Sequence, residues 1–416
     1  MKYRWKRQTA IFLTSQGISL FGSALVQFAI TAYISVQTKS GVYATLAILC
    51  AILPTFVLSP FAGVWADKYN RKLLTILADA GIALCTLIMV IFFSTGKGSI
   101  NILLVALAVR ALGAAVQMPA VSALLPDIVP EDQLTRINGI NGTLQSLFTL
   151  LSPILGAFLL GFASLEAIFL IDVVTAVIAI VILVAAFKLP KKEKVEKKEA
   201  TGAYFSEMYE GIKYIWNNKF LVEFFIFFTI FLIAMAPAAF LTQIQVVRNY
   251  GEGYWYLSVM EVAFSGGMLI GGIAISIWKG FSNKVNMIIV SAIGQGICTF
   301  LLGIKVPFVL YCIIMITYGI IVPFLNTPGM TLLQEKVDPQ YMGRVFGIMT
   351  MINTSMLPLG MVIFGPLADK VSIEALLLGT GVVIVLLAIA MSRAKALVQV
   401  GAETKAKADK EAKANV

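Results

Sequence analysis

The sequence contains no histidine and few charged residues. Histidine is absent from all 416 residues, and Asp, Glu, Lys and Arg together make up 13%. Without imidazole, histidine is excluded as a metal ligand, catalytic base or proton carrier, so any proton chemistry must use carboxylates. Because an average soluble chain is about 25% charged, the scarcity of charge also excludes a water-soluble domain.

Cysteines and nucleotide-binding motifs are also scarce. No G-x-x-x-x-G-K-[ST] sequence occurs, and no soluble segment is long enough to form an ATPase. We therefore expect no enzyme activity, catalytic residue, metal or cofactor, and we expect any transport to draw on an ion or substrate gradient. The four cysteines all lie in apolar runs, which is typical of small core residues rather than disulfides or metal ligands: Cys50, Cys85, Cys298 and Cys312.

Apolar residues are abundant and make up 59% of the chain. Twelve bilayer spans of about 20 residues each would need roughly 240 apolar residues, close to the number present. The sequence therefore predicts an all-α integral membrane protein. Its apolar runs predict transmembrane helices near residues 9–36, 41–65, 72–94, 100–121, 138–162, 166–187, 220–247, 255–278, 286–303, 307–330, 343–367 and 372–392.

The basic residues are distributed unevenly across this topology. Of the 32 Lys and Arg residues, 26 fall on one side of the membrane and 5 on the other. By the positive-inside rule, both termini and the long middle loop face the cytoplasm of a bacterial-type inner or plasma membrane. Because the net charge of +10 reflects this topology, we expect no nucleic-acid partner.

The chain contains an internal repeat. Arg136-Ile-Asn-Gly139 returns as Arg344-Val-Phe-Gly347, and Ser164-Leu-Glu166 returns as Ser372-Ile-Glu374, both 208 residues later. Two matches at one offset predict two pseudo-symmetric six-helix halves. Such repeats usually place the substrate site at their interface and alternate its access by rocking.

We expect four segments in the chain. Residues 1–187 and 220–392 form the two six-helix halves, 188–219 form a cytoplasmic linker, and 393–416 form a cytoplasmic tail of low complexity to which we assign no structure. Apolar residues at helical spacing predict an amphipathic helix on the membrane face within the linker: Phe205, Met208, Ile212, Ile215 and Trp216.

A charged motif lies between the second and third spans. It reads Gly63-Val-Trp-Ala-Asp67-Lys68-Tyr-Asn-Arg71-Lys72 and resembles, at every defining position, the G-x-x-x-D-[RK]-x-x-R-[RK] loop of the major facilitator superfamily. Gly63 lets a neighbouring helix approach, and Asp67 and Arg71 can pair with each other or with a helix end. The resemblance implies a cytoplasmic gate formed by Gly63, Asp67, Arg71 and Lys72.

Two further stretches resemble motifs of this superfamily more weakly. Arg110 with Gly113 resembles an Arg/Gly stretch assigned to proton coupling in exporters. Ser152-Pro153-Ile-Leu-Gly156 resembles the G-P-x-x-G antiporter element, with serine for the first glycine, and assigns Pro153 and Gly156 to a hinge or packing role.

Residues 5–190 look similar to the macrolide-efflux branch of the superfamily. The resemblance includes Trp5-Lys6, Leu25-Val-Gln27-Phe-Ala-Ile30 and Val129-Pro-Glu-Asp-Gln-Leu-Thr135. Much of it is shared with siderophore and lysolipid transporters, so the identity of the substrate does not follow.

Four charged residues inside the spans are candidates for proton coupling: Asp79, Arg110, Asp172 and Glu261. Each such charge costs about 2.5–3.5 kcal/mol to insert and therefore needs a reason. Asp79 and Arg110 either pair with each other or take part in coupling, and Asp172 either has a local structural partner or takes part. Glu261 lies two turns into its span with no basic residue near it in sequence, a setting that favours proton uptake, and it is our first candidate.

Neutral polar residues recur at helical spacing and are candidates to line the substrate cavity. Such stripes either join helices through hydrogen bonds or form a polar cavity wall, and both readings stay open. The candidates are Gln16, Gln27, Asn141, Gln145 and Asn326.

The leading hypothesis is a secondary active exporter that exchanges protons for amphipathic, macrolide-type drug molecules by alternating access. A siderophore exporter or lysolipid flippase would carry the same motifs, and a nutrient/proton symporter is an alternative of another class. The expected partners are a small amphipathic molecule, protons and the lipid bilayer, and we expect a monomer.

Overall fold

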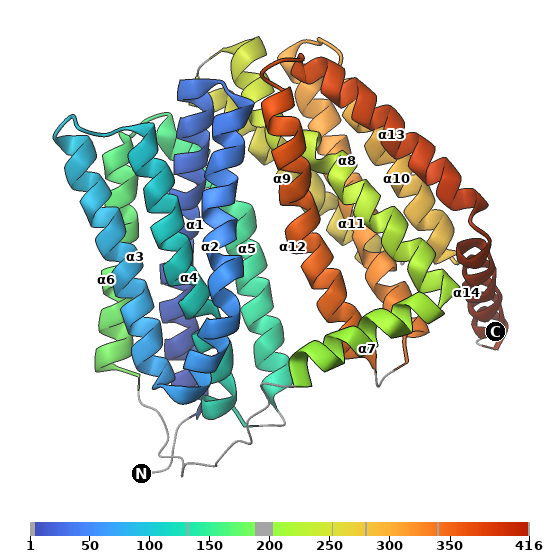
Figure 1. Ribbon diagram of the computed structural model, residues 1–416, viewed down its shortest axis with the longest axis horizontal. Coiled ribbons are helices and arrows are strands. Elements are labelled where there is room, and N and C mark those ends of the chain that lie inside the picture. The colour runs from blue at the N-terminus through green and yellow to red at the C-terminus, as the bar shows by residue number, and fades with distance from the viewer. Residues whose placement is uncertain are drawn as a thin grey trace. The chain divides into compact units, whose positions relative to one another are not determined.

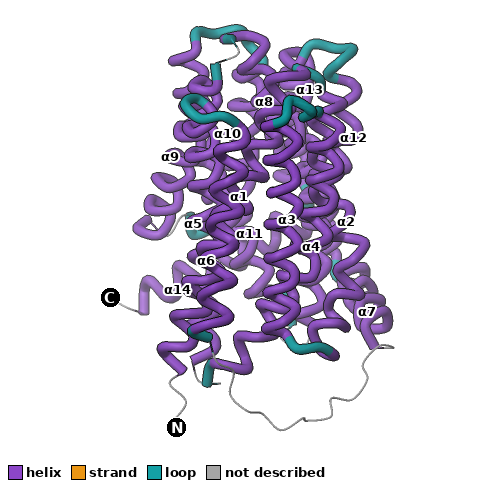
Figure 2. The backbone as a smooth tube through the Cα atoms, turned by 90° about the vertical axis from the view of Figure 1, so that its left-hand side faces the viewer, coloured by secondary structure: helices purple, strands orange, loops and turns teal. Residues whose placement is uncertain are grey.

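The protein is almost entirely helical. The computed structural model describes residues 5–130, 133–187, 203–251, 253–278, 281–338 and 341–414, and these contain no strand. Twelve of the described helices are long and apolar enough to cross a membrane. Short loops join most of them (Figure 2). The predicted all-α, twelve-span membrane fold is confirmed.

The first of two compact units contains the described parts of residues 1–39, 43–195 and 251–258. Helix α1 packs against α4, α5 and α6, and α3 packs against α4 and α6. These contacts bury a core that includes Phe12, Leu124 and Phe187. The helices are α1 (Trp5–Thr38), α2 (Gly41–Lys68), α3 (Arg71–Ser94), α4 (Ile100–Ile128), α5 (Leu134–Leu160) and α6 (Leu165–Ala185) (Figure 1).

Small residues on α1 and α5 allow close helix contacts in this unit. A Cβ on Gly156 of α5 would lie 2.7 Å from the Phe28 ring, and one on Gly22 of α1 would lie 2.0 Å from Thr175 Oγ1 of α6. Any larger residue at these positions would push the helices apart. Gly156 therefore lies at a close approach, whereas Pro153 is one turn earlier inside the same helix.

The second unit contains the described parts of residues 40–42, 196–250 and 259–416. Its contacts repeat those of the first: α8 packs against α12 and α13 as α1 packs against α5 and α6, and α10 packs against α11 and α13 as α3 packs against α4 and α6. The spanning helices are α8 (Lys219–Tyr250), α9 (Tyr254–Trp278), α10 (Lys284–Leu302), α11 (Phe308–Lys336), α12 (Met342–Leu367) and α13 (Ile373–Arg393).

One of the sequence repeats has a local structural explanation. The Ser164 side chain accepts the Ala167 N–H at the start of α6, and the Ser372 side chain accepts the Ala375 N–H at the start of α13. A serine cap satisfies one of the unpaired N–H groups of a helix start, and an acid in the first turn favours the helix dipole. The repeated Ser-x-Glu is thus the start signal of the sixth span in each half.

Helix α7 (Ala203–Asn217) occupies the region where the linker helix was expected, and it packs against α8 and α12. In Figure 1 it runs across the direction of the long helices of its unit. Ile215 is buried and Tyr214 stacks on Tyr341 with ring centroids 4.2 Å apart, whereas Trp216 is 77% exposed. The helix therefore has one packed side and an exposed aromatic residue. The side chains of Phe205 and Met208 lie outside the described residues.

The tail prediction was wrong, because α14 (Lys395–Ala414) is a helix that packs against α8, α10 and α13. Its Ala, Lys and Glu residues are strong helix formers, and its first turn is anchored. Leu397 is fully buried, and its backbone N–H donates to the Glu223 carboxylate of α8 at 3.1 Å. The low complexity of the tail sequence gave no indication of this helix, which tertiary contacts hold in place at its N-terminal end.

Two adjacent glycines of α9 provide a test of helix packing in the second unit. A Cβ on Gly271 would lie 2.2 Å from the carbonyl oxygen of Ile320 on α11, whereas a Cβ on Gly272 would meet nothing within 4 Å. Gly271→Ala should lower the free energy of unfolding by about 1–3 kcal/mol through overpacking. Gly272→Ala is the matched control and should be neutral or slightly stabilising. Thermal unfolding of purified protein in detergent measures both, and equal midpoints for the two variants would contradict the packing.

Candidate functional site

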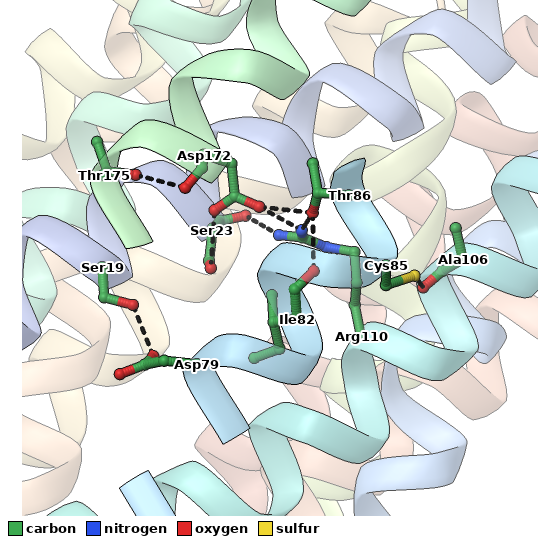
Figure 3. A network of polar contacts seen from close by, with 10 residues as sticks. All are labelled: Ser19, Ser23, Asp79, Ile82, Cys85, Thr86, Ala106, Arg110, Asp172 and Thr175. Atoms are coloured by element: carbon green, nitrogen blue, oxygen red, sulfur yellow. Dashed lines mark hydrogen bonds and ion pairs between the residues drawn. The ribbon is translucent and has the colours of Figure 1, made fainter. Parts of the chain in front are cut away.

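A buried cluster of polar residues in the first unit surrounds an ion pair between α4 and α6 (Figure 3). Arg110 Nη1 lies 2.5 Å from Asp172 Oδ2, and the two residues are 4% and 0% exposed. The Thr86 hydroxyl of α3 lies 2.7 Å from the same carboxylate oxygen and accepts a hydrogen bond from Arg110. From α1, Ser23 contributes its hydroxyl to Asp172 at 3.2 Å and its carbonyl oxygen to Arg110 Nη2 at 3.2 Å. Side chains from four helices, α1, α3, α4 and α6, therefore meet at one ion pair whose charges cancel.

The structure corrects the predicted partner of Arg110, which is Asp172 rather than Asp79. Asp79 lies seven residues before Thr86 on α3, about 10 Å along the helix, so it is too far from the guanidinium group that Thr86 contacts. Asp172 lies beside Thr86 because α6 packs on both α1 and α3. Of the two readings of Asp172 that the sequence left open, a local partner is the one observed.

Asp79 has neutral partners. Its Oδ1 accepts hydrogen bonds from Ser19 of α1 at 2.7 Å and from Gln117 of α4 at 2.5 Å. Its Oδ2 is buried without a hydrogen-bond partner among the described residues. A buried carboxylate with only neutral donors is much less costly when protonated, so Asp79 is better suited to hold a proton than Asp172, whose charge is balanced by Arg110.

The gate motif uses its basic residues to join helix ends. Arg71 donates from Nε to the Ala66 carbonyl oxygen at 3.0 Å and from Nη1 to the Ala123 carbonyl oxygen at 2.9 Å. It also forms an ion pair with Asp127 at 2.5 Å. The C-terminal ends of α2 and α4 carry partial negative charge, which a guanidinium group stabilises.

Lys72 makes a similar contact. Its ammonium group donates to the carbonyl oxygen of Phe187 at 2.7 Å, just beyond α6. Gly63 and Asp67 lie in the last turns of α2, and the contacts of these two residues fall outside the described part of the chain. The sequence left two kinds of partner open for Arg71, Asp67 or a helix end, and the structure shows contacts with helix ends.

The sequence analysis missed Asp127. Its signal was an acid in the last turn of α4, directly after Pro126. The second unit has an equivalent pair, because Lys284 at the start of α10 lies 2.5 Å from Glu335 at the end of α11. The pair between the third and fourth spanning helices of each unit is thus repeated, although the loop motif itself is not.

Glu261 lies in α9 and is half-buried. Its Oε1 accepts a hydrogen bond from Gln243 Nε2 of α8 at 3.3 Å. Among the residues that the structure describes, no Lys or Arg forms an ion pair with it. The carboxylate thus has a neutral hydrogen-bond partner.

The second unit contains a cavity of about 290 Å³. Asn326 of α11 and Asn353 of α12 supply amide groups to a lining that is otherwise apolar and rich in aromatic and Met side chains. It includes Phe224, Phe227, Phe228, Phe231, Met330, Met349 and Met391. Such a surface suits an apolar molecule with a few polar groups.

Only one of the five predicted cavity residues, Asn326, lines this cavity. The other four belong to the first unit. Gln16 is buried, Gln27 and Asn141 are half-buried, and Gln145 is exposed. The structure therefore does not bring all five to one described cavity.

Comparison with known proteins places the chain in a family. The family model described as Major Facilitator Superfamily matches residues 10–361. The chain belongs to the Major Facilitator Superfamily. It is a multi-pass membrane transporter and not an enzyme.

Relatives within this superfamily agree with the predicted branch. The chain is 31% identical to macrolide efflux protein A of Streptococcus pyogenes over 390 residues, covering 92% of this chain and 95% of the relative. It is 22% identical to the staphyloferrin A transporter of Staphylococcus aureus over 374 residues, covering 87% and 89%. The resemblance to the macrolide-efflux and siderophore-exporter branch is confirmed.

A solved structure supports the fold independently. The nucleoside transporter NupG superposes with a TM-score of 0.64 at 15% sequence identity, covering 94% of this chain and 99% of NupG. At this identity the likeness concerns the fold alone.

The Arg110–Asp172 pair can be tested with a double-mutant cycle. Arg110→Met or Asp172→Asn alone leaves an unpaired buried charge and should cost about 3–5 kcal/mol of unfolding free energy, whereas the double variant should cost less than the sum. An Arg110→Met/Asp79→Asn cycle is the matched control and should give near-additive effects. Thermal unfolding in detergent measures both cycles. Additivity at Arg110 and Asp172, with coupling at Arg110 and Asp79, would restore the original pairing.

Proposed function

We propose that this transporter is a proton-coupled antiporter that exports amphipathic, macrolide-type molecules by alternating access. The observation that carries this proposal is the aromatic and Met-lined cavity of the second unit. Its few amides can orient a polar group while its rings contact an apolar body. Aromatic faces and flexible Met side chains also tolerate ligands of varied shape, as multidrug efflux requires.

The size of the cavity limits what it holds. At about 290 Å³ it is near the lower end of ligand pockets, so it accommodates part of a large substrate rather than all of it. The Streptococcus pyogenes relative is a macrolide efflux protein, which supports a substrate of this class. Export of such drugs would confer antibiotic resistance.

Glu261 is the first candidate for carrying the counter-proton. Its described polar partner, Gln243, is neutral, so protonation need not break an ion pair. Asp79 is the second candidate for the same reason, since Ser19 and Gln117 are neutral. Asp172 becomes the last candidate for carrying the proton, because protonating it would leave the buried Arg110 guanidinium group without its counter-charge. Arg110 takes a structural role for the same reason.

The motif Gly63, Asp67, Arg71 and Lys72 serves as the cytoplasmic gate in this proposal. Arg71 and Lys72 hold the inner ends of α2, α4 and α6 in place, which positions the end of α2 where Asp67 lies. The distribution of basic residues supports cytoplasmic termini, and a monomer is sufficient for the cycle.

A transport assay distinguishes this proposal from the other substrates of the same branch. An acyl chain would also suit the apolar cavity, so lysolipid flipping would appear as transport of lysolipid without a requirement for a pH gradient. Nutrient symport would appear as uptake in the direction of the proton gradient.

Replacing Glu261 with Gln should separate coupling from binding. Because the amide cannot exchange a proton, Glu261→Gln should reduce pH-gradient-driven accumulation in proteoliposomes by at least about tenfold while passive exchange of substrate persists. A fluorescent macrolide or dye retained by inside-out vesicles provides the readout.

The control for this experiment is Glu166→Gln, which neutralises an acid in the first turn of α6. It should transport as the parent does. If Glu261→Gln still accumulates substrate against its gradient, Glu261 is not the coupling site, and Asp79→Asn should then show the loss.

A further inference from the structure

The cavity of the second unit offers amide groups but no charge. Among the described residues that line it, the polar side chains are Asn326 and Asn353, and none is Asp, Glu, Lys or Arg. Glu223 directly precedes Phe224 of the lining, but its carboxylate accepts the Leu397 N–H of α14 at 3.1 Å. A charged group in this cavity would therefore meet no counter-charge among the described residues that form it.

One wall of the cavity is aromatic and comes from α8. Phe224, Phe227, Phe228 and Phe231 line the cavity, and their spacing places them on one face of the helix. The rings of Phe224 and Phe228 stack with their centroids 6.0 Å apart and 11° between their planes. This wall gives an apolar molecule a flat surface to contact.

Aromatic rings also attract cations, so the two effects must be compared. Trp is the strongest aromatic partner of a cation, and the described lining contains neither Trp nor Tyr. The attraction of a cation to Phe rings is smaller than the cost of burying an ion without a counter-charge. The aromatic wall therefore does not compensate a cation for the water that it loses.

The two amides can compensate an uncharged polar group. Asn353 Nδ2 donates to the Met349 carbonyl oxygen at 3.1 Å, which leaves its own carbonyl oxygen as an acceptor. Asn326 makes no hydrogen bond with the described part of the chain, so its amide offers a ligand both donors and an acceptor. A ketone, ester or hydroxyl group can accept from or donate to such amides, and its burial then costs little.

We propose that this cavity discriminates by charge: it takes an uncharged, oxygen-bearing part of the exported molecule and excludes cationic groups. Asn326 and Asn353 are the specificity-determining residues, because they are the polar groups that this part meets. The inference rests on the export function proposed above, since it assigns the part of the substrate that the same cavity holds. A positively charged amine on the substrate then lies outside this cavity.

Binding of a matched pair of dyes to the purified protein tests this selectivity without transport. Prodan is an uncharged naphthyl ketone whose fluorescence changes in apolar surroundings, and its N-methylated analogue has the same body with a permanent positive charge. In detergent, with no pH gradient, prodan should bind saturably. The Kd of the cationic analogue, measured by competition, should be at least about tenfold higher.

A cavity-filling variant assigns the binding to this site. Gly329 lines the cavity, and a Cβ on it would lie 3.8 Å from Phe224 Cζ, in ordinary contact. The larger side chain of Gly329→Leu should occupy the space and abolish saturable prodan binding. Thermal unfolding of the same sample shows whether the variant is folded.

A carboxylate in place of an amide should change the selectivity. Asn326→Asp keeps the shape of the side chain and supplies the missing counter-charge, so it should shift the ratio of the two Kd values toward the cation by at least about tenfold. Asn286→Asp is the matched control, because Asn286 is an exposed residue of α10 outside the cavity lining. It should keep the ratio of the parent. Asn353→Asp decides the question if Asn326→Asp does not fold.

Three results would overturn the inference. They are the absence of saturable prodan binding, a cationic analogue that binds the parent as tightly as prodan, and an unchanged ratio in the folded aspartate variants. Because the measurement uses neither a pH gradient nor a macrolide, failure of proton-driven macrolide export would contradict the proposed function without changing this result.

Discussion

The structure depends on how charge is accommodated inside an apolar bundle. In hydrocarbon there is no water to solvate a carboxylate or a guanidinium group, so each must find its partner within the protein. The Arg110–Asp172 pair meets this requirement for the first unit and draws Thr86 and Ser23 into contact with it. Four helices are thereby held in one relative position, and a change to either charge affects all of them.

The acids that lack such a pair are the ones available for proton chemistry. Asp79 and Glu261 have neutral hydrogen-bond partners, so each can gain or lose a proton without leaving a buried cation unpaired. The need to balance buried charge therefore separates Asp172, which has a structural role, from Asp79 and Glu261, which are candidates for proton coupling.

Sequence reasoning predicted the twelve spans and the repeat of six helices in each half, because both depend on local composition or spacing. It did not predict the partner of Arg110, since the choice between Asp79 and Asp172 depends on where α6 packs against α3. It also missed α14, whose stability comes from Leu397 and from the Glu223 carboxylate, 174 residues earlier in the chain. Long-range contacts of this kind are set by tertiary packing, which a single sequence does not display.

The central claim is that a proton gradient drives export of an amphipathic molecule through this fold. The most direct measurement is transport by the unmodified protein in proteoliposomes, against a panel of macrolides, cationic dyes and lysolipids, with and without an imposed pH gradient. Our account predicts accumulation of macrolides or dyes against their gradient only when the pH gradient is present, together with proton movement in the opposite direction. Transport that is unaffected by the pH gradient, or that moves substrate in the same direction as protons, would contradict it.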